Sequence, residues 1–479
     1  MSTRKLIQEA LGGVGKERKP LRTAYFEDLV DIVLNSNEPK FLLSNGDLVD
    51  ERVIDDLLFI PPAKEKLGFS LPKYDEVEQS HTRHSGVTGV SGVSESAGGC
   101  LEDKNLFEKI VQFHKDSAEL PDDRLYLIIT AWDFHTHLIE KFEYSPIVFF
   151  AGLPEKGKSR MAKSMIAVSR RGIIKASVTD AQLIREASDH LATLFFDSTD
   201  FAKAMERSGS MDIVLSRYER GLKVGRVKFP EKGAFEDMVY YDVFGATIIS
   251  SNQTIDSILG SRTITIIMRQ ATKKLAKRVN FKAGDHLRNE LIAWRWAHFN
   301  DTFPEPERII NGRFGDIIEP LHQIILKVYP ESEKDFIDIV KELEKKRYIA
   351  KGDSLEGEII QAILGLEEAR IHGILAVKSI TNKINDNRSE RDQLTYQRVG
   401  RKLDIMGFTK AKTGNGSSAI EWNEKLNMSL ATEHNITDTP PEASETGETP
   451  VTLQNKPDLS ESTPQKEELP EWQEMDPRV

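Results

Sequence analysis

The chain has 479 residues, of which 39% are hydrophobic and 29% charged, and its formal net charge is −11. This length suits a soluble protein of two to four domains. The sequence has no run of eighteen apolar residues and no basic segment followed by an apolar one at its N-terminus. We therefore expect neither membrane insertion nor secretion. The single cysteine, Cys100, excludes an intramolecular disulfide and favours a reducing cytoplasm.

The negative charge is concentrated at the C-terminus. Residues 431–479 contain twelve acidic and three basic residues, so they carry −9 and leave about −2 for the rest of the chain. Their abundance of Pro, Glu, Ser and Thr predicts a disordered acidic tail. Because the body is nearly neutral, the acidic average does not exclude nucleic acid as a partner.

Two segments open the chain. Residues 1–75 mix short helical patterns with turn signals, and we expect a small accessory domain there. Residues 76–102 contain a stretch of repeated Gly, Ser and Val with few large apolar groups. Such a stretch buries too little surface to offset its ordering entropy, so it predicts a flexible linker.

Residues 103–144 predict a helical lead-in to the next region. It contains His135 and His137, two positions apart. On a helix this spacing points the two rings to different faces, so they do not share a metal ion. We expect core or solvated histidines.

A phosphate-binding pattern, G-x-x-x-x-G-K-[ST], follows the apolar run Ile147–Ala151 and precedes a helical pattern. Strand, glycine loop and helix in that order surround a phosphate with backbone N–H groups and the positive end of a helix dipole, which disfavours a chance glycine-rich turn. Lys158 then reaches the β- and γ-phosphates, and the Ser159 hydroxyl ligates Mg²⁺. We therefore expect ATP and Mg²⁺ as cofactors, held by Gly152, Leu153, Pro154, Glu155, Lys156, Gly157, Lys158, Ser159 and Arg160.

Apolar strand patterns alternate with helical patterns after the loop. Together with the strand at 147–151 they predict an α/β fold with a five-stranded parallel sheet, the AAA+ or RecA-like core of a P-loop NTPase, over residues 145–271. The four further strands are predicted at 172–178, 191–197, 244–251 and 263–269.

Two more regions complete the chain. Residues 280–350 predict a helical lid region. Residues 355–428 predict a C-terminal winged helix, with a helix near 394–406 and two strands flanking the turn at 414–416.

Four residues are candidates for catalysis. Asp197 ends an apolar strand at the edge where parallel sheets bind ligands, and we expect it to hold Mg²⁺. The next residue is Ser198 rather than the usual glutamate, so Asp200 is the nearest carboxylate that could act as a base. Asn252, at the tip of the next strand, is placed to orient water or the γ-phosphate, or is a simple turn former. Arg262 is either a surface arginine or a cation that reaches a neighbouring subunit's nucleotide.

Two basic segments are candidates for nucleic-acid contact. Lys223, Arg226 and Lys228 alternate with apolar residues in an expected hairpin. That hairpin is similar to the DNA-tracking hairpin of hexameric helicases, although a solvated edge strand protected by its charges is the alternative. In the winged-helix region, a helix capped by Thr395 carries phosphate-binding side chains, unless the module binds protein instead. These side chains are Arg398, Arg401 and Lys402.

The order of these segments resembles a family of P-loop ATPases of uncharacterised function, encoded in phages, plasmids and integrated elements and often found beside primase modules. The resemblance covers roughly residues 125–425. It rests on the segments GLPEKGKSR, TDAQLIREASDHLATLFFD, LSRYERGLKVGRVKF, DVFGATIIS, SRTITIIMR and GRFGDIIEPLHQII. Family members generally read Asp-Glu-Ala-Asp where this chain has Asp-Ser-Thr-Asp at 197–200. This departure favours a slow, switch-like ATPase or one that uses Asp200.

The resemblance implies an oligomeric, ATP-dependent, helicase-like motor that acts on DNA, either single-stranded or at a fork, during replication of a mobile element. It also implies a primase or helicase partner, whereas the lack of a long apolar run argues against a membrane partner. The alternative is an ATP-controlled adaptor or helicase loader with little turnover. Ser198 favours the adaptor, whereas the basic hairpin and Arg262 favour the motor.

Overall fold

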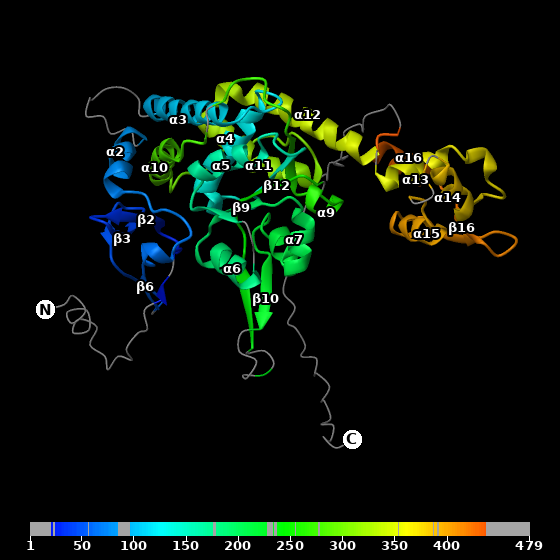
Figure 1. Cartoon of the computed structure of the whole chain (residues 1–479), viewed down its shortest axis with the longest axis horizontal. Helices are drawn as coiled ribbons and strands as arrows, with labels where there is room; N and C mark the ends of the chain where they lie inside the picture. The colour runs from blue at the N-terminus through cyan, green and yellow to red at the C-terminus, as the bar shows by residue number, and fades with distance from the viewer. Residues whose placement is uncertain are drawn as a thin grey trace, which may run out of the picture. The chain divides into compact units, whose positions relative to one another are not determined.

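The computed structural model is shown in Figure 1. It divides into two compact units, Met1–Arg347 and Tyr348–Val479, and each is described by itself. Within the described part of the chain, no helix has the length and apolar composition needed to cross a membrane. The described residues are 21–22, 24–55, 57–84, 96–175, 179–227, 233, 237–253, 255–275, 278–352, 354–386, 388–389 and 392–436.

A five-stranded parallel sheet forms the centre of the first unit. Its strands are β7 (Ile147–Ala151), β8 (Gly172–Lys175), β9 (Thr193–Asp197), β12 (Thr247–Ser251) and β13 (Thr263–Ile267). They are ordered β13-β7-β12-β9-β8, and every neighbouring pair is parallel. The inner strands are almost wholly buried, as their continuous apolar runs predict. The predicted α/β fold with a parallel sheet is confirmed.

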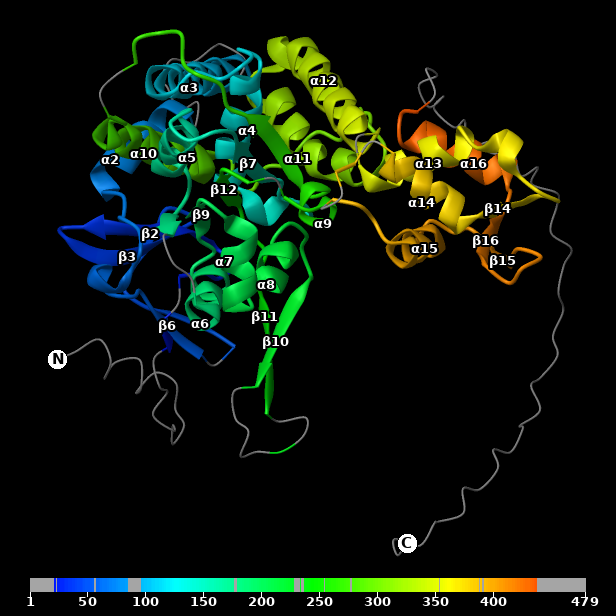
Figure 2. The ribbon, with the colours of Figure 1, turned by 45° about the vertical axis from the view of Figure 1, so that its right-hand side comes forward.

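Helices cover this sheet on both sides. In Figures 1 and 2, α3, α4, α10 and α11 lie with α5 above the sheet, and α7 lies below it. One continuous hydrophobic core runs from Leu106 to Leu343, so the helices before and after the sheet pack around it. Besides α2 (Tyr74–His84), the helices of the described part of this unit are α3 (Ser96–Ser117), α4 (Leu125–His137), α5 (Lys158–Val168), α6 (Asp180–Ile184), α7 (Phe201–Ser208), α8 (Met211–Ser216), α9 (Ser257–Gly260), α10 (Phe281–Ala297), α11 (Gly312–Val328) and most of α12 (Glu333–Gly352).

The described residues between 21 and 60 are mainly strands, so the short helical patterns read there are wrong. Two three-stranded sheets form, ordered β2-β3-β4 and β1-β6-β5. Ser36 and Asn37 have φ of 49° and 70°, which makes the tight turn that joins β2 to β3. The strands are β1 (Leu21–Arg22), β2 (Leu29–Asn35), β3 (Glu38–Leu43), β4 (Leu48–Val49), β5 (Arg52–Ile54) and β6 (Leu57–Ile60).

Much of the linker expected at 76–102 is helical. Helix α2 (Tyr74–His84) includes residues 76–84, and residues 96–102 belong to α3. Val77 of α2 is buried against Ile292 of α10, a partner more than 200 positions away in the sequence. The linker prediction fails there because the burial that orders these helices comes from distant segments. Residues 85–95 lie outside the described part of the chain.

An antiparallel hairpin extends from the first unit where a basic hairpin was expected. It pairs β10 (Lys223–Val227) with β11 (Met238–Asp242) over all five residues of each strand. Figure 1 shows it extending away from the sheet, below α7. Its connecting residues 228–232 and 234–236, which include Lys228, lie outside the described part of the chain.

After the end of α12, the described residues of the second unit form the helices α13 to α16 and a small sheet ordered β14-β16-β15, with antiparallel pairs. The helix predicted at 394–406 is α15, and the two predicted strands are β15 and β16. The predicted tail begins too early, because residues 431–433 belong to α16 and Ala431 is buried. The elements are α13 (Leu355–Leu364), β14 (Ile374–Ala376), α14 (Val377–Asn385), α15 (Tyr396–Ile405), β15 (Lys410–Lys412), β16 (Ser418–Glu421) and α16 (Glu424–Glu433).

Short helical turns complete the described chain. They are η1 (Lys64–Lys66), η2 (Ile139–Lys141), η3 (Arg185–Asp189), η5 (Pro330–Ser332) and η6 (Glu367–Ala369).

Candidate nucleotide-binding site

The glycine loop lies between β7 and α5, at the carboxyl end of the sheet. Gly152 has φ of 143°, and a Cβ there would lie 2.8 Å from the carbonyl oxygen of Met268, so only glycine fits beside the chain leaving β13. Gly157 has φ of 84° and precedes the first turn of α5. These two backbone turns direct the N-terminus of α5 toward the space enclosed by the loop.

Lys158 lies inside this loop. Its Nζ donates hydrogen bonds to the carbonyl oxygens of Gly152 and Leu153 at 2.8 and 2.6 Å, and the residue is only 6% exposed. Burial lowers the pKa of Lys158, while the charge of Asp197 raises it. The ammonium group is therefore held where a phosphate oxygen could replace the two carbonyls as its partner.

Three side-chain oxygens meet beside the loop. The Ser159 hydroxyl donates to Asp197 Oδ1 at 2.7 Å, and the Ser250 hydroxyl lies 3.3 Å from both partners. Ser250 on β12 is the register partner of Asp197 on β9, so the sheet itself sets this contact. A hydroxyl and a carboxylate oxygen are ligands that suit Mg²⁺, which keeps most of its coordination as water and phosphate. The residues present therefore fit this ion.

The polypeptide after Asp197 is tied to the tip of β12. The Ser198 amide donates to the carbonyl of Ser250 at 3.1 Å, and the Asn252 amide donates to the carbonyl of Thr199 at 3.2 Å. Asn252 therefore lies at the same edge as Asp197. The Asp200 carboxylate accepts from the Lys203 amide at 3.2 Å and caps α7, a local role that sequence reasoning missed. The role of Asp200 as a base for the attacking water stays a prediction.

Arg262 lies at the opposite end of the sheet from its own loop. It directly precedes β13, and its carbonyl oxygen accepts from the amide of Ile147 at the start of β7. Its guanidinium donates to the carbonyl of Ile258 at 2.6 Å and lies 4.7 Å from the ring of Tyr218. Arg313, which the sequence reasoning missed, lies 5.9 Å from the same ring. No local signal in the sequence marks Arg313.

The two histidines of α4 are core residues, as expected. His135 and His137 are both completely buried. His137 contacts the carbonyl oxygen of Val168 at 2.9 Å, and the His135 ring packs on Phe142 at 4.8 Å. Burial lowers the pKa of each ring to about 3, so both are neutral at pH 7. The described residues contain no cluster of three His, Cys, Asp or Glu able to hold a metal.

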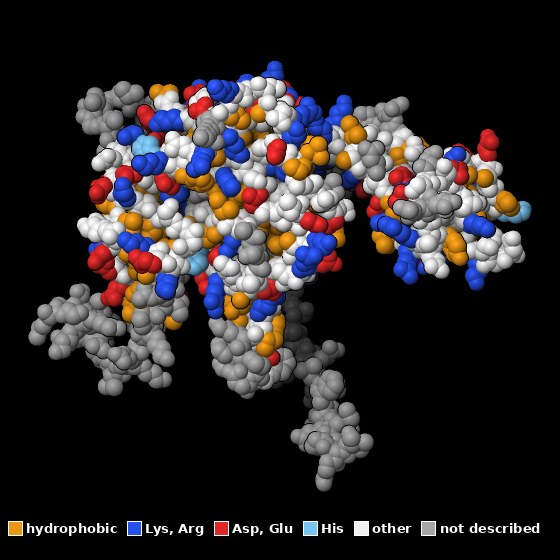
Figure 3. All heavy atoms as spheres, viewed as in Figure 1, with side chains coloured by type: hydrophobic (Ala, Val, Ile, Leu, Met, Phe, Trp, Pro, Cys, Tyr) orange, Lys and Arg blue, Asp and Glu red, His pale blue; other side chains and the backbone are white. Residues whose placement is uncertain are grey.

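The hairpin presents fewer accessible charges than its sequence indicates. Arg226 contacts Asp180 at 2.7 Å and Asp212 at 3.4 Å, so two carboxylates compensate its charge. Lys223 is exposed. Val227 is 57% exposed and Tyr240 66% exposed, and Figure 3 shows hydrophobic side chains on this part of the molecule. Among its described residues, the hairpin therefore combines the exposed cation of Lys223 with exposed apolar and aromatic groups.

Helix α15 carries the basic side chains predicted in the second unit. The Thr395 hydroxyl accepts from the Arg398 amide at 3.3 Å, as a cap of this helix should. Arg398 and Arg401 are exposed, whereas Lys402 donates to Glu356 at 2.6 Å. A shallow depression of about 300 Å³ on this helix is lined by Thr395, Gln397, Arg398, Arg401, Lys402 and Ile405.

No family model and no curated protein matches the chain. Among solved structures, it is similar to SCCmec type IV Cch, an active helicase, at 13% identity and a TM-score of 0.33, over 82% of this chain and 78% of that one. It is similar to the apo A form of the NrS-1 C-terminal region at 14% identity and a TM-score of 0.33, over 88% of this chain and 89% of that one. It is also similar to a full-length MCM homologue from Methanopyrus kandleri at 11% identity and a TM-score of 0.35, over 65% of this chain and 72% of that one.

Proposed function

We propose that the chain binds ATP with Mg²⁺ in the loop Gly152–Ser159. The observation that carries this proposal is the 2.7 Å contact between the Ser159 hydroxyl and the Asp197 carboxylate, beside a loop that already holds the Lys158 ammonium. The two oxygens belong to different elements, 38 positions apart in the sequence. A chance glycine-rich turn would not bring a carboxylate at a strand end to this hydroxyl.

Each residue of the site then has a separate task. Lys158 exchanges the carbonyls of the loop for phosphate oxygens, and the amides at the start of α5 donate to the same anion. Ser159 and Asp197 hold the ion, and Asn252 orients water. When bound, ATP supplies a phosphoanhydride whose hydrolysis drives conformational change. Ser198 provides no general base, so we expect slow turnover.

Removing the Lys158 ammonium tests this proposal. Lys158→Ala should abolish binding of a fluorescent ATP analogue, while the melting temperature stays near that of the wild type. Lys115→Ala is the matched control, because Lys115 forms an ion pair with Asp123 on the surface. Retained affinity in a folded Lys158→Ala protein would refute nucleotide binding by this loop.

We further propose that the protein is a DNA-associated, helicase-like motor of a mobile element. The exposed Lys223 and Tyr240 of the hairpin, and the exposed Arg398 and Arg401 of α15, support contact with single-stranded DNA or a replication fork. We assign the second unit to the winged-helix class, since its helices and strands follow in the order α13, β14, α14, α15, β15 and β16.

The distance of Arg262 from its own loop supports a homo-oligomer, in which this cation serves the nucleotide of a second copy. Mixing two inactive variants tests the idea. Lys158→Ala supplies Arg262, and Arg262→Ala supplies an intact loop, so the mixture should regain part of the ATPase rate. Light scattering with a non-hydrolysable analogue reports the assembly. A mixture as inactive as its components, despite assembly, would remove Arg262 from this role.

The second candidate is an ATP-controlled adaptor or helicase loader, which recruits a primase or helicase and turns over little. Ser198 favours it, because a serine next to Asp197 offers no carboxylate. The ATPase rate with and without single-stranded DNA distinguishes the two. A rate that DNA raises severalfold supports the motor, and a low rate that DNA leaves unchanged supports the adaptor.

A further inference from the structure

The strand order determines on which side of the glycine loop the nucleoside half of a nucleotide lies. Asp197 and Asn252 lie at the ends of β9 and β12, on one side of β7, and β13 lies on the other side. The terminal phosphate belongs beside the ion-binding oxygens of Ser159 and Asp197. A triphosphate placed in this way extends its ribose and base toward the chain that leaves β13.

The segment Arg269–Lys274, which we call the post-β13 segment, borders the loop on that side. The Met268 amide donates to the carbonyl of Ala151 at 2.8 Å, so the chain leaves β13 in contact with the start of the loop. Lys156 Nζ donates to Gln270 Oε1 at 2.8 Å. The loop and the segment therefore lie side by side and are joined by these hydrogen bonds.

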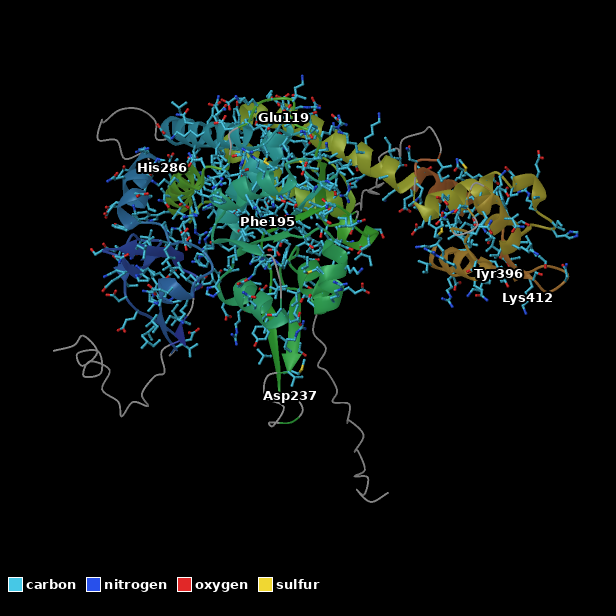
Figure 4. The ribbon with its side chains drawn as sticks, viewed as in Figure 1. Glu119, Phe195, Asp237, His286, Tyr396 and Lys412 are labelled. Carbon is cyan, nitrogen blue, oxygen red and sulfur yellow. The ribbon has the colours of Figure 1, made fainter. Side chains whose placement is uncertain are left out.

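Glu119 holds the post-β13 segment. Its carboxylate accepts from the Thr272 amide at 2.7 Å, from the Thr272 hydroxyl at 2.7 Å and from the Lys273 amide at 2.9 Å. The Lys273 and Thr272 hydrogen bonds lower the pKa of Glu119, so the group is charged at neutral pH. Figure 4 shows Glu119 at the upper edge of the first unit, above Phe195 of the central sheet.

The turn that carries Glu119 is itself fixed from two sides. The Tyr126 hydroxyl donates to the carbonyl of Ala118 at 2.7 Å and accepts from the Leu120 amide at 3.1 Å, so the residues on either side of Glu119 are tied to α4. The Arg160 guanidinium donates to the carbonyl of Ser117. Because Arg160 follows Ser159 in α5, this turn connects the first turn of the loop helix to the post-β13 segment.

We propose that Glu119 is a positioning residue that fixes the post-β13 segment as the wall of a subsite for the ribose and base of the nucleotide. This inference rests on the proposed nucleotide binding. It separates the site into two parts, because the phosphates contact the loop and α5, whereas the nucleoside contacts a segment held by a carboxylate from α3–α4. Loss of Glu119 should therefore weaken binding of a nucleotide and leave binding of its phosphate chain unchanged.

Comparing ATP with inorganic tripolyphosphate tests this separation. For Glu119→Gln we expect the Kd of ATP to rise about tenfold, because an amide cannot accept from all three donors that the carboxylate accepts from. The Kd of tripolyphosphate should stay within about twofold. Thr272→Val, which removes one donor and keeps the backbone, should raise the Kd of ATP in the same direction by less. Glu331→Gln, which breaks a surface ion pair with Lys104, is the control and should change neither constant.

The outcomes separate the two proposals. If the wild type binds neither ATP nor tripolyphosphate, the loop is not a nucleotide site and the proposed function fails. If the wild type binds both but Glu119→Gln weakens both equally, or neither, the positioning role is overturned while the proposed function stands. Melting temperatures show whether each variant folds. If Glu119→Gln does not fold, Thr272→Val decides, and an unchanged ratio of the two constants overturns the inference.

Discussion

Ser198 follows Asp197 at the carboxyl end of β9, where a glutamate would supply a second carboxylate. Apart from Asp197 itself, the nearest carboxylate in the sequence is that of Asp200, which accepts a hydrogen bond from the Lys203 amide and caps α7. A group that caps a helix is held by that hydrogen bond and is less suited to take a proton from water. If the proposed nucleotide binding holds, the site has groups for phosphate and Mg²⁺, and the component it lacks is a free carboxylate that could act as a base.

Restoring that carboxylate should raise the rate. We expect Ser198→Glu to increase steady-state ATP turnover by at least about tenfold, since a positioned base contributes about 10²–10⁴-fold. Asp200→Asn is the control, because asparagine also caps helices, and it should be tolerated in the Ser198→Glu background. A fast wild type whose rate Asp200→Asn leaves unchanged would show that another residue positions the water.

The buried histidines make stability depend on pH. Burial lowers the pKa of His135 and His137 to about 3, below the ordinary 6.5 of the unfolded chain. Between these values the unfolded chain binds more protons, so stability is highest above pH 6.5 and falls as the pH decreases. Asp133 has the opposite effect on stability, because burial raises its pKa from the ordinary 3.8 to about 6. Between these two pH values the folded chain binds more protons, so the contribution of Asp133 to stability falls as the pH rises.

Replacing one ring isolates its contribution. His135→Phe keeps a ring against Phe142 and removes the titration, so the fall in melting temperature between pH 7 and pH 5 should become smaller, equivalent to about 2 kcal/mol at pH 5. Equal slopes for wild type and His135→Phe would contradict the assigned cause.

At the scale of elements, the sequence predicts those helices and strands that have a clear local pattern of their own. The apolar run of β7, the glycine loop and α15 with its Thr395 cap have local patterns, and the structure contains all three. Strand β2 was missed because Asp31 interrupts its apolar run. Asp31 is nevertheless buried, since Arg171 contacts it at 2.6 Å from 140 positions away. Local periodicity contains no information about such a partner.

Asp31 should therefore be essential for attaching this N-terminal sheet to the central parallel sheet. Burial alone would raise the pKa of Asp31, but Arg171 and Arg170 hold it well below its usual range. Asp31→Asn would leave the buried arginines short of a counter-charge, and we expect about 3–5 kcal/mol less stability in denaturant unfolding. Asp28→Asn, which breaks an exposed pair with Arg52, should cost less than about 1 kcal/mol. Equal losses of stability in Asp31→Asn and Asp28→Asn would show that the buried ion pair of Asp31 contributes no more to stability than the exposed pair of Asp28.

The hairpin provides a second test at this scale. Tyr240 is two-thirds exposed on β11, so its ring is available to stack on a base. We expect Tyr240→Ala to weaken single-stranded DNA binding about tenfold, the size of one lost stacking contact. Tyr240→Phe keeps the ring and should bind as the wild type does. Fluorescence anisotropy with a labelled oligonucleotide measures both, and equal affinities for Ala and Phe would exclude stacking.

At the scale of the whole molecule, the candidate site is assembled from segments far apart in the chain. The loop residues were identified from sequence because they are contiguous. Ser250 and Glu119 were missed, since Ser250 lies 91 positions from Ser159 and Glu119 lies 153 positions from Thr272. Only the sheet register and the packing of the lead-in helices bring them to the loop. The sequence therefore predicts the contiguous glycine loop, which stays a candidate phosphate site, and it does not predict the contacts that distant segments make with that loop.

The acidic C-terminus allows a test of charge on the full chain. Residues 437–479 contain eleven acidic and three basic residues and little apolar surface. A cut after Ile436 should leave ATP affinity and melting temperature nearly unchanged, because α16 and the buried Ala431 stay in place. The same cut should strengthen nonspecific DNA binding at low salt, since it removes eight net negative charges, and the gain should vanish as salt screens them.

A cut after Asn423 is the contrasting variant. It removes α16, and Ala431 with it, from the hydrophobic core of the second unit. We expect this protein to lose the thermal transition of the second unit, which scanning calorimetry would detect, because a small core loses one of its covering helices. A large fall in melting temperature for the cut after Ile436 would instead show that the acidic segment packs on the body. Unchanged DNA affinity at low salt would show that the charge of the acidic segment does not reach the proposed DNA-binding surface.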